Sequence, residues 1–185
     1  MPVGLLGLQG AFRDHIRHLS ALGASYLVVK RPEHLELIDR LIIPGGESTV
    51  MLKYLKDFLI EEPLRKRIAA GLPVWGICAG CIILAQTVNG APGLIGVLPI
   101  NAERNAYGRQ LQSSIAEINI PLLERKNFYA FFIRAPRLLP KGNNLEIHAV
   151  CGPDPVFVQS GTVMATTFHP ELTEDPVFHE HFLHL

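Results

Sequence analysis

Gly76-Ile77-Cys78-Ala79-Gly80 is the stretch of the sequence that predicts most about the fold. One apolar run precedes it at residues 72–75, and another follows it at residues 82–85. This order indicates a buried strand, an abrupt turn and a helix, with a nucleophile at the turn. Glycines beside the turn are expected because a Cβ there would crowd the neighbouring backbone. We therefore expect the Cys78 thiol at the carboxyl end of a strand and the positive end of a helix.

The bulk composition indicates one globular domain over residues 1–185. The chain is 48% hydrophobic and 18% charged, with a formal net charge of zero, which fits a sizeable core and offers no basic surface for nucleic acid or membranes. No apolar run approaches the roughly 18–20 residues of a membrane span. Three cysteines give no disulfide framework. We expect a cytoplasmic protein.

The first half of the chain alternates strand and helix patterns, as in an α/β fold with a mainly parallel sheet covered on both faces. Predicted strands lie at residues 3–8, 26–29, 41–43 and 74–77, and predicted helices at residues 12–22, 50–59 and 64–70.

The second half is richer in strand patterns. They lie at residues 111–118, 129–133, 145–150, 156–159 and 163–168, before a short closing helix within residues 176–185. Turn-forming residues separate them. We expect antiparallel extensions of the same sheet or a second small sheet.

Cys78 needs activation, because a free thiol is only a few per cent ionised at neutral pH. His169 is the best candidate for the base, since it follows the predicted strand at residues 163–168. Glu171 lies two residues on and would face the same way in extended backbone. The three residues would form a nucleophile–base–orienter triad.

Pro44-Gly45-Gly46-Glu47-Ser48 directly follows another predicted strand. The backbone N–H of Gly45 or Gly46, with that of Ala79, is predicted to form an oxyanion hole. Ser48 is placed to cap the following helix.

The sequence gives weaker support for redox activity or metal binding. Cys78 and Cys81 form a C-x-x-C pair that could be redox-active, but Cys81 is interpreted as core packing, and Cys151 as structural. His15 and His18 are expected on a solvated helix face rather than on a metal. Three histidines near the C-terminus are expected at the surface or in tail packing: His179, His181 and His184.

No phosphate-binding glycine motif is present, so the sequence does not predict a nucleotide-dependent reaction.

Five separated segments resemble the triad (class I) glutamine amidotransferases and, among them, the glutaminase subunits of pyridoxal 5′-phosphate synthase. The segments are GLLGLQGAFRDH (residues 4–15), PGGEST (44–49), GICAG (76–80), RNAYGRQ (104–110) and TFHPELTED (167–175), with FIRAP (132–136) in addition. Ile77 and Cys81 depart from this pattern, where the family often has Thr and Met, without removing a catalytic group.

The resemblance implies that Cys78 attacks L-glutamine and releases ammonia, with His169 moving the proton and Glu171 orienting it. It implies no metal and no cofactor. Gln9 and Gly10 would lie near the site and the partner surface. The implied glutamine-binding residues are Gly46, Glu47, Ser48, Arg104, Ile133 and Arg134.

The ammonia would pass to a separate synthase subunit in a hetero-oligomeric complex, for vitamin B6 biosynthesis. Two alternatives stay open: a glutaminase serving another partner, such as imidazole glycerol phosphate synthase, and a redox-sensing protein with its cysteine on an elbow.

Overall fold

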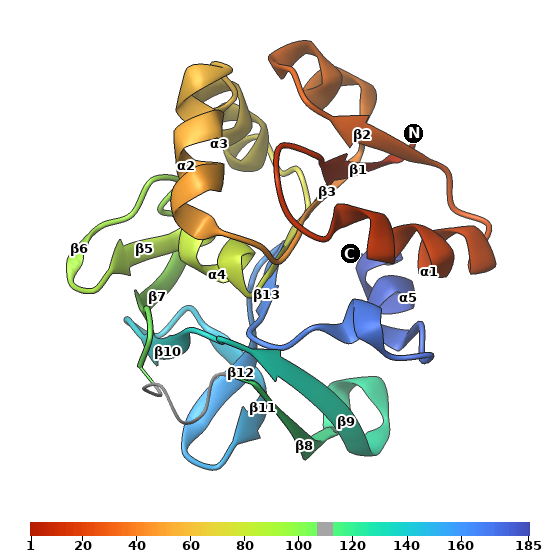
Figure 1. The fold of residues 1–185 in the computed structure, drawn as a ribbon, viewed down its shortest axis with the longest axis vertical. Helices are drawn as coiled ribbons and strands as arrows, with labels where there is room; N and C mark the ends of the chain where they lie inside the picture. Colours follow the sequence, from red (N-terminus) through yellow and green to blue (C-terminus); the bar gives the residue numbers. More distant parts are fainter. Residues whose placement is uncertain (107–112) are drawn as a thin grey trace.

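The computed structural model describes residues 1–106 and 113–185. The last four residues of the RNAYGRQ segment and the start of the strand predicted at residues 111–118 lie outside this range. The described chain is an α/β fold built around a seven-stranded sheet (Figure 1).

The central sheet has the strand order β11-β12-β13-β4-β3-β1-β2. The five strands β2, β1, β3, β4 and β13 run parallel, whereas β12 pairs antiparallel with β13 and β11 pairs antiparallel with β12. Their bounds are β1 Val3–Leu6, β2 Tyr26–Val29, β3 Arg40–Ile43, β4 Val74–Ile77, β11 Glu146–Cys151, β12 Asp154–Ser160 and β13 Val163–Thr166. The predicted mainly parallel sheet with antiparallel extensions is confirmed.

Two further sheets flank this one. A four-stranded sheet has the order β10-β7-β5-β6, and β8 pairs with β9 in a two-stranded ribbon. Their bounds are β5 Ala85–Val88, β6 Ala91–Pro92, β7 Leu98–Glu103, β8 Ser113–Ile120, β9 Arg125–Ile133 and β10 Arg137–Pro140. Strands β5, β6, β7 and β10 were not predicted from the sequence.

Helices cover both faces of the central sheet. The α-helices are α1 Ile16–Ala21, α2 Ser48–Asp57, α3 Glu61–Ala69, α4 Ala79–Leu84 and α5 Val177–Leu183. Short 3₁₀-helices are η1 Phe12–His15, η2 Pro32–Leu37, η4 Pro121–Leu123 and η5 Pro170–Leu172. In Figure 1, α2 and α3 lie on one side of the sheet and α1 and α5 on the other.

Alternate residues of the central strands serve two separate cores. In β3, Ile43 packs with Met51 and Leu55 of α2, whereas Ile42 packs with Trp75 and Phe178 on the opposite face. Burial on both faces explains why these strands read as continuous apolar runs.

The two histidines expected on a solvated helix face are buried instead, so that interpretation is wrong. His15 is 0% exposed and His18 is 4% exposed. Both belong to the core that contains Trp75 and α5, where His179 is also 0% exposed. Helical spacing placed these side chains on one face, but it did not reveal that α5 covers that face.

The turn between β4 and α4 requires its two glycines for steric reasons. A Cβ on Gly76 would lie 2.7 Å from the carbonyl carbon of Gly80, and a Cβ on Gly80 would lie 2.5 Å from the carbonyl oxygen of Ile43. Both distances are too short for any real Cβ contact. The glycines therefore let α4 start directly against the end of β3.

Among the described residues, none of the helices is both long and apolar enough to cross a membrane.

We expect Gly80→Ala to destabilise the fold by about 3 kcal/mol, because a backbone oxygen cannot move away as a flexible side chain could. Chemical denaturation of the purified variant measures this. Gly142→Ala is the matched control, since nothing lies within 4 Å of its Cβ and only its φ of +77° opposes the change. That control should cost about 1 kcal/mol; equal losses in both variants would contradict the steric explanation.

Candidate active site

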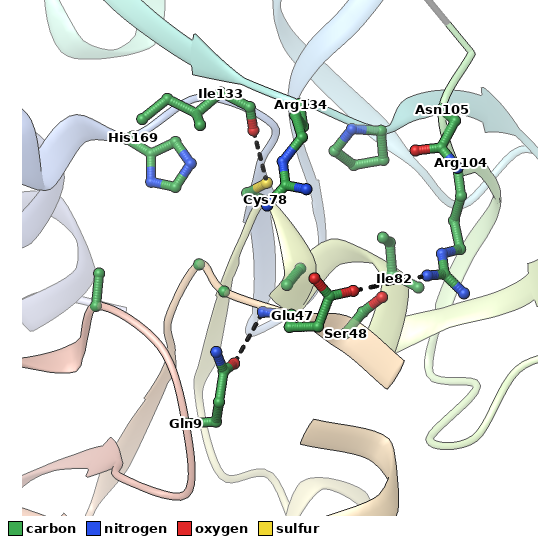
Figure 2. Close-up of a pocket in the computed structure, with 15 residues that line it drawn as sticks. Gln9, Glu47, Ser48, Cys78, Ile82, Arg104, Asn105, Ile133, Arg134 and His169 are labelled. Carbon is green, nitrogen blue, oxygen red and sulfur yellow. Dashed lines mark hydrogen bonds and ion pairs between the residues drawn. The ribbon is translucent and has the colours of Figure 1, made fainter. Parts of the chain in front are cut away.

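The carboxyl ends of the parallel strands meet at one edge of the central sheet, where ligands bind in open α/β folds. A cavity of about 330 Å³ lies at this edge. It is lined by Gln9, Ala11, Gly45, Gly46, Glu47, Ser48, Cys78, Ala79, Ile82, Arg104, Asn105, Ile133, Arg134, Pro136 and His169. Cys78 and His169 lie at one side of it and Gln9 and Glu47 at the other (Figure 2).

Cys78 occupies the predicted turn in a strained conformation. Its φ is +49° and its ψ is −96°, a region that side-chain-bearing residues rarely adopt and that often marks a functional position. Its backbone N–H donates to the carbonyl of Thr166 at 2.8 Å, which fixes the turn against β13. Its thiol reaches the carbonyl oxygen of Ile133 at 3.6 Å. The side chain is thus held at the cavity wall rather than packed behind it.

His169 and Glu171 interact directly. Nδ1 of His169 lies 2.6 Å from Oε1 of Glu171, and the Glu171 side chain is buried. The pair does not arise from extended backbone, as the sequence suggested. Residues 170–172 form the 3₁₀-helix η5, and Pro170 starts it. His169 is anchored separately, through its N–H to the carbonyl of Phe131 at 2.9 Å.

The electrostatics of this pair favour a charged imidazole. Burial lowers the pKa of His169, but Cys78 and the carboxylate of Glu171 outweigh it and raise that pKa from 6.5 to about 10. Burial is the largest single influence and would raise the pKa of Glu171, yet the hydrogen bond from His169 and the electrostatic attraction to His15 and His169 together outweigh it and leave that pKa below its ordinary value. Opposite charges at short range stabilise each other in this way. The second ring nitrogen, Nε2, is buried without a hydrogen-bond partner in the described chain and is free to serve the thiol or a substrate.

The two glycines after β3 have different surroundings. A Cβ on Gly45 would collide with the His169 ring, and the Gly45 carbonyl already accepts the N–H of Ala11 at 3.0 Å. Gly45 therefore makes room for the imidazole. Gly46 and Ala79 line the cavity beside Cys78. The N–H of Ala79 belongs to the first turn of α4, where no acceptor exists within the helix.

Glu47 connects two walls of the cavity. Its backbone N–H donates to Oε1 of Gln9 at 2.8 Å. Its carboxylate lies 4.0 Å from Nη2 of Arg104. Arg134, whose φ is +47°, is exposed on the wall formed after β9. One carboxylate and two guanidinium groups thus line the same cavity as the thiol.

Ser48 does not cap α2 as predicted. The N-cap position is Glu47, which makes no side-chain capping bond, and Ser48 is the first residue of the helix. Ser48 is nevertheless buried in the cavity wall. The cap lies one residue earlier than predicted, because α2 begins at Ser48 rather than at residue 50.

The structure brings every predicted site residue together except Glu171, which lies behind His169 and does not line the cavity. Four lining residues were not predicted: Ala11, Ile82, Asn105 and Pro136. Three of them are small or apolar and give no chemical signal. Asn105 follows Arg104 within the RNAYGRQ segment, so that motif could have indicated it.

Cys81 is fully buried, three residues after Cys78. Its thiol donates to the carbonyl of Thr166 at 3.1 Å, and burial raises its pKa well above the ordinary value. A buried, protonated thiol is a poor redox partner. Within residues 1–106 and 113–185, no three side chains of the metal-binding types are grouped to hold a metal ion.

The chain matches a family model described as the SNO glutamine amidotransferase family over residues 5–185. It is 47% identical to "Pyridoxal 5'-phosphate synthase subunit PdxT" of Thermotoga neapolitana, covering 100% of this chain and 99% of that protein. The protein of the same name from Thermotoga maritima is 48% identical with the same coverage. A solved structure described as a glutamine amidotransferase superposes with a TM-score of 0.93 at 43% identity, covering 100% of this chain and 98% of its own.

We expect His169 to remain protonated at pH 8 in the unmodified protein. In Cys78→Ala it should lose its proton at a lower pH than in the unmodified protein, because Cys78 contributes to its raised pKa. Imidazole nitrogen shifts in NMR measure both titrations. His15 is the internal control, since burial lowers its pKa to about 4 and should keep it neutral throughout. A His169 that titrates near 6.5 in the unmodified protein would contradict the assignment.

Proposed function

The chain belongs to the SNO glutamine amidotransferase family, and on that premise we propose that it hydrolyses L-glutamine to L-glutamate and ammonia with Cys78 as nucleophile. The observation that carries the proposal is the combination of two features. Cys78 has a strained backbone at the cavity wall, and Nδ1 of the neighbouring His169 lies 2.6 Å from the buried carboxylate of Glu171. This is the arrangement of an activated nucleophile, its base and an orienting acid. The cavity in front of it suits a small, charged amino acid.

The first half of the reaction forms a thioester. The ionised sulfur of Cys78 attacks the carboxamide carbon, and the negative charge that develops on oxygen is stabilised by the N–H groups of Ala79 and Gly46. The protonated Nε2 of His169 then gives its proton to the departing nitrogen. Ammonia leaves as the carbon–nitrogen bond breaks.

The second half releases glutamate. Neutral His169 removes a proton from water, and the resulting hydroxide attacks the thioester carbonyl at the same oxyanion site. The carbon–sulfur bond breaks, and Cys78 returns to its ionised form beside the reprotonated imidazole. Glu171 keeps Nδ1 of His169 protonated through both halves, so Nε2 is always the nitrogen that exchanges protons.

The charged walls of the cavity fit the two ends of an α-amino acid. We assign the α-carboxylate to the guanidinium groups of Arg104 and Arg134, which suit carboxylate geometry. The α-ammonium is assigned to Glu47. Ser48 and Ile133 complete the pocket wall around the side chain of glutamine.

The ammonia is proposed to pass to a pyridoxal 5′-phosphate synthase subunit in a hetero-oligomeric complex. The relatives that are 47% and 48% identical over the whole chain carry that name, which supports this partner. The glutaminase would form a single domain over residues 1–185, since the central sheet takes strands from both halves of the chain. The mechanism uses neither a metal nor a cofactor.

Cys78→Ala should abolish glutamate production, with a loss of about 10⁴-fold or more, because no other group can form the thioester. The assay couples glutamate release to glutamate dehydrogenase, with and without a pyridoxal 5′-phosphate synthase subunit. Cys151→Ala serves as the matched control and should retain activity. Glutaminase activity that survives in Cys78→Ala would refute the mechanism, and activation by a cyclase subunit instead would refute the partner.

Glu47→Gln should raise the KM for glutamine about tenfold with a smaller change in kcat, because a charge-assisted contact to the α-ammonium is lost. Steady-state kinetics in the complex measures both constants. Glu62→Gln is the control, since Glu62 lies on α3 and pairs with Lys66 at 3.6 Å, away from the cavity. An unchanged KM in Glu47→Gln would remove Glu47 from the substrate site.

A further inference from the structure

Three buried histidines do not line the cavity, and one of them, His15, lies in η1, which contacts the Glu171 segment η5. We call His15, His18 and His179 the histidine cluster. They come from η1, α1 and α5 and are each at most 4% exposed. The mechanism above does not use them, and they do not form a metal-binding group.

The cluster is tightly connected. Nδ1 of His15 lies 2.9 Å from Nε2 of His179, and the ring of His18 stacks on that of His179 at 4.4 Å. The rings of His15 and His179 both meet the indole of Trp75 edge-on, at 5.7 and 5.0 Å. Trp75 belongs to β4, which leads directly to the Cys78 turn. The cluster is therefore packed against the strand that presents the nucleophile.

The same N-terminal segment also holds the backbone of η5. Nη2 of Arg17 donates to the carbonyl oxygen of Glu171 at 2.9 Å, and Nη1 pairs with Glu174 at 2.8 Å. Helix η1 contacts η5. The segment that carries His15 is thus fixed against the segment that carries Glu171.

Glu171 uses only one of its two carboxylate oxygens in the described contacts. Oε1 accepts from His169, whereas Oε2 is buried with no hydrogen-bond partner in the described residues. Nε2 of His15 is likewise buried without a partner there, so the two atoms are not bonded to each other as they stand. A buried carboxylate oxygen left bare is costly. His15 and Glu171 also influence each other's pKa, since Glu171 raises that of His15 and His15 lowers that of Glu171. His18 is affected by the backbone of Glu171 instead, which raises its pKa.

The contact between His15 and His179 has two possible directions, and the carboxylate distinguishes them. If His15 donated through Nδ1, its buried Nε2 would carry a lone pair within the negative field of Glu171, which acts on the His15 ring. If His179 donates through Nε2, His15 accepts at Nδ1 and carries its own proton on Nε2. The second arrangement is electrostatically favourable, because the buried Nε2 then carries a proton rather than a lone pair in the negative field of Glu171.

We propose that His15 is a positioning residue for the catalytic carboxylate: as a neutral imidazole set by His179, it offers its Nε2–H to the bare Oε2 of Glu171, and the bond forms when either side chain rotates towards the other. This donor holds the carboxylate in the rotation that gives Oε1 to His169. It also favours the ionised carboxylate and thereby the imidazolium beside Cys78. The effect of His15 on glutamine turnover rests on the proposed function, but the effect of His15 on the reactivity of the Cys78 thiol does not.

The surroundings of His15 keep it neutral. Burial lowers its pKa to about 4, opposed by the negative charges of Glu171 and Asp14 and assisted by His18 and His169. Burial and the neighbouring His15 also lower the pKa of His179. His15 therefore acts as a hydrogen-bond donor at neutral pH rather than as a cation.

The test compares His15→Leu, which removes the donor, with His15→Gln, whose side-chain amide can restore it. The readout is the rate of iodoacetamide alkylation at Cys78 between pH 5.5 and 9.5, resolved by peptide mass spectrometry on the full chain. His148→Leu is the matched control, because His148 packs on Phe157 in the same half of the molecule but faces no triad residue. Thermal unfolding and glutaminase kinetics accompany each variant.

At pH 7 we expect His15→Leu to lower the alkylation rate about tenfold, because the imidazolium of His169 beside the reacting sulfur loses part of its support. The rate should return to that of the unmodified protein near pH 9.5, where thiols ionise without help. His15→Gln should stay within about threefold of the unmodified protein, and His148→Leu should match it. kcat should fall with the alkylation rate while KM stays constant.

An unchanged alkylation profile in His15→Leu, or a profile that His15→Gln fails to restore, would overturn the proposal. If His15→Leu does not fold, His179→Phe provides the second variant, because it removes the donor that sets the His15 tautomer while keeping a ring. It should shift the profile in the same direction, and no shift would equally overturn the proposal. A shifted profile in a chain without glutaminase activity would instead refute the proposed function and leave this inference standing.

Discussion

The close approach of α4 to the end of β3 is the constraint on which the rest of the site depends. It is possible because Gly80 lacks a Cβ, which would lie 2.5 Å from the carbonyl oxygen of Ile43. With the helix start pressed against the sheet, Cys78 must turn within one residue, and it does so at a φ of +49°. The strain is retained because the packed core on both faces of β4 leaves the backbone no alternative.

Parallel strands then bring the other components to the thiol. β3 delivers the glycine pair, β1 delivers Gln9, and β13 leads to His169, since all of these strands end at the same edge. Gly45 and Gly10 are needed for the same reason as Gly80, because a Cβ at Gly45 would collide with the His169 ring and one at Gly10 with the Gly45 carbonyl. The site is assembled by close backbone packing, and its charged groups are added to that frame.

Much of the fold could be predicted from local patterns of apolar and turn-forming residues. Strands β2 and β4 have the predicted bounds, because short, fully buried strands appear as uninterrupted apolar runs between turn residues. The small flanking sheet was missed, since β5 follows α4 without a break and β6 spans only residues 91–92. The Glu171 geometry was attributed to extended backbone, whereas Pro170 starts a 3₁₀ turn that gives the same contact by another route.

The sequence by itself predicted the proposed nucleophile, base and acid and located the glycine loop, because those predictions depend on residue type and on immediate neighbours. The tertiary structure alone decided which surroundings each group has. His15 and His18 show this most clearly, since helical spacing is the same for a solvated and a buried face. Only the packing of α5 against η1 and Trp75 buries them, and contacts across more than 150 residues of chain leave no local pattern in the sequence.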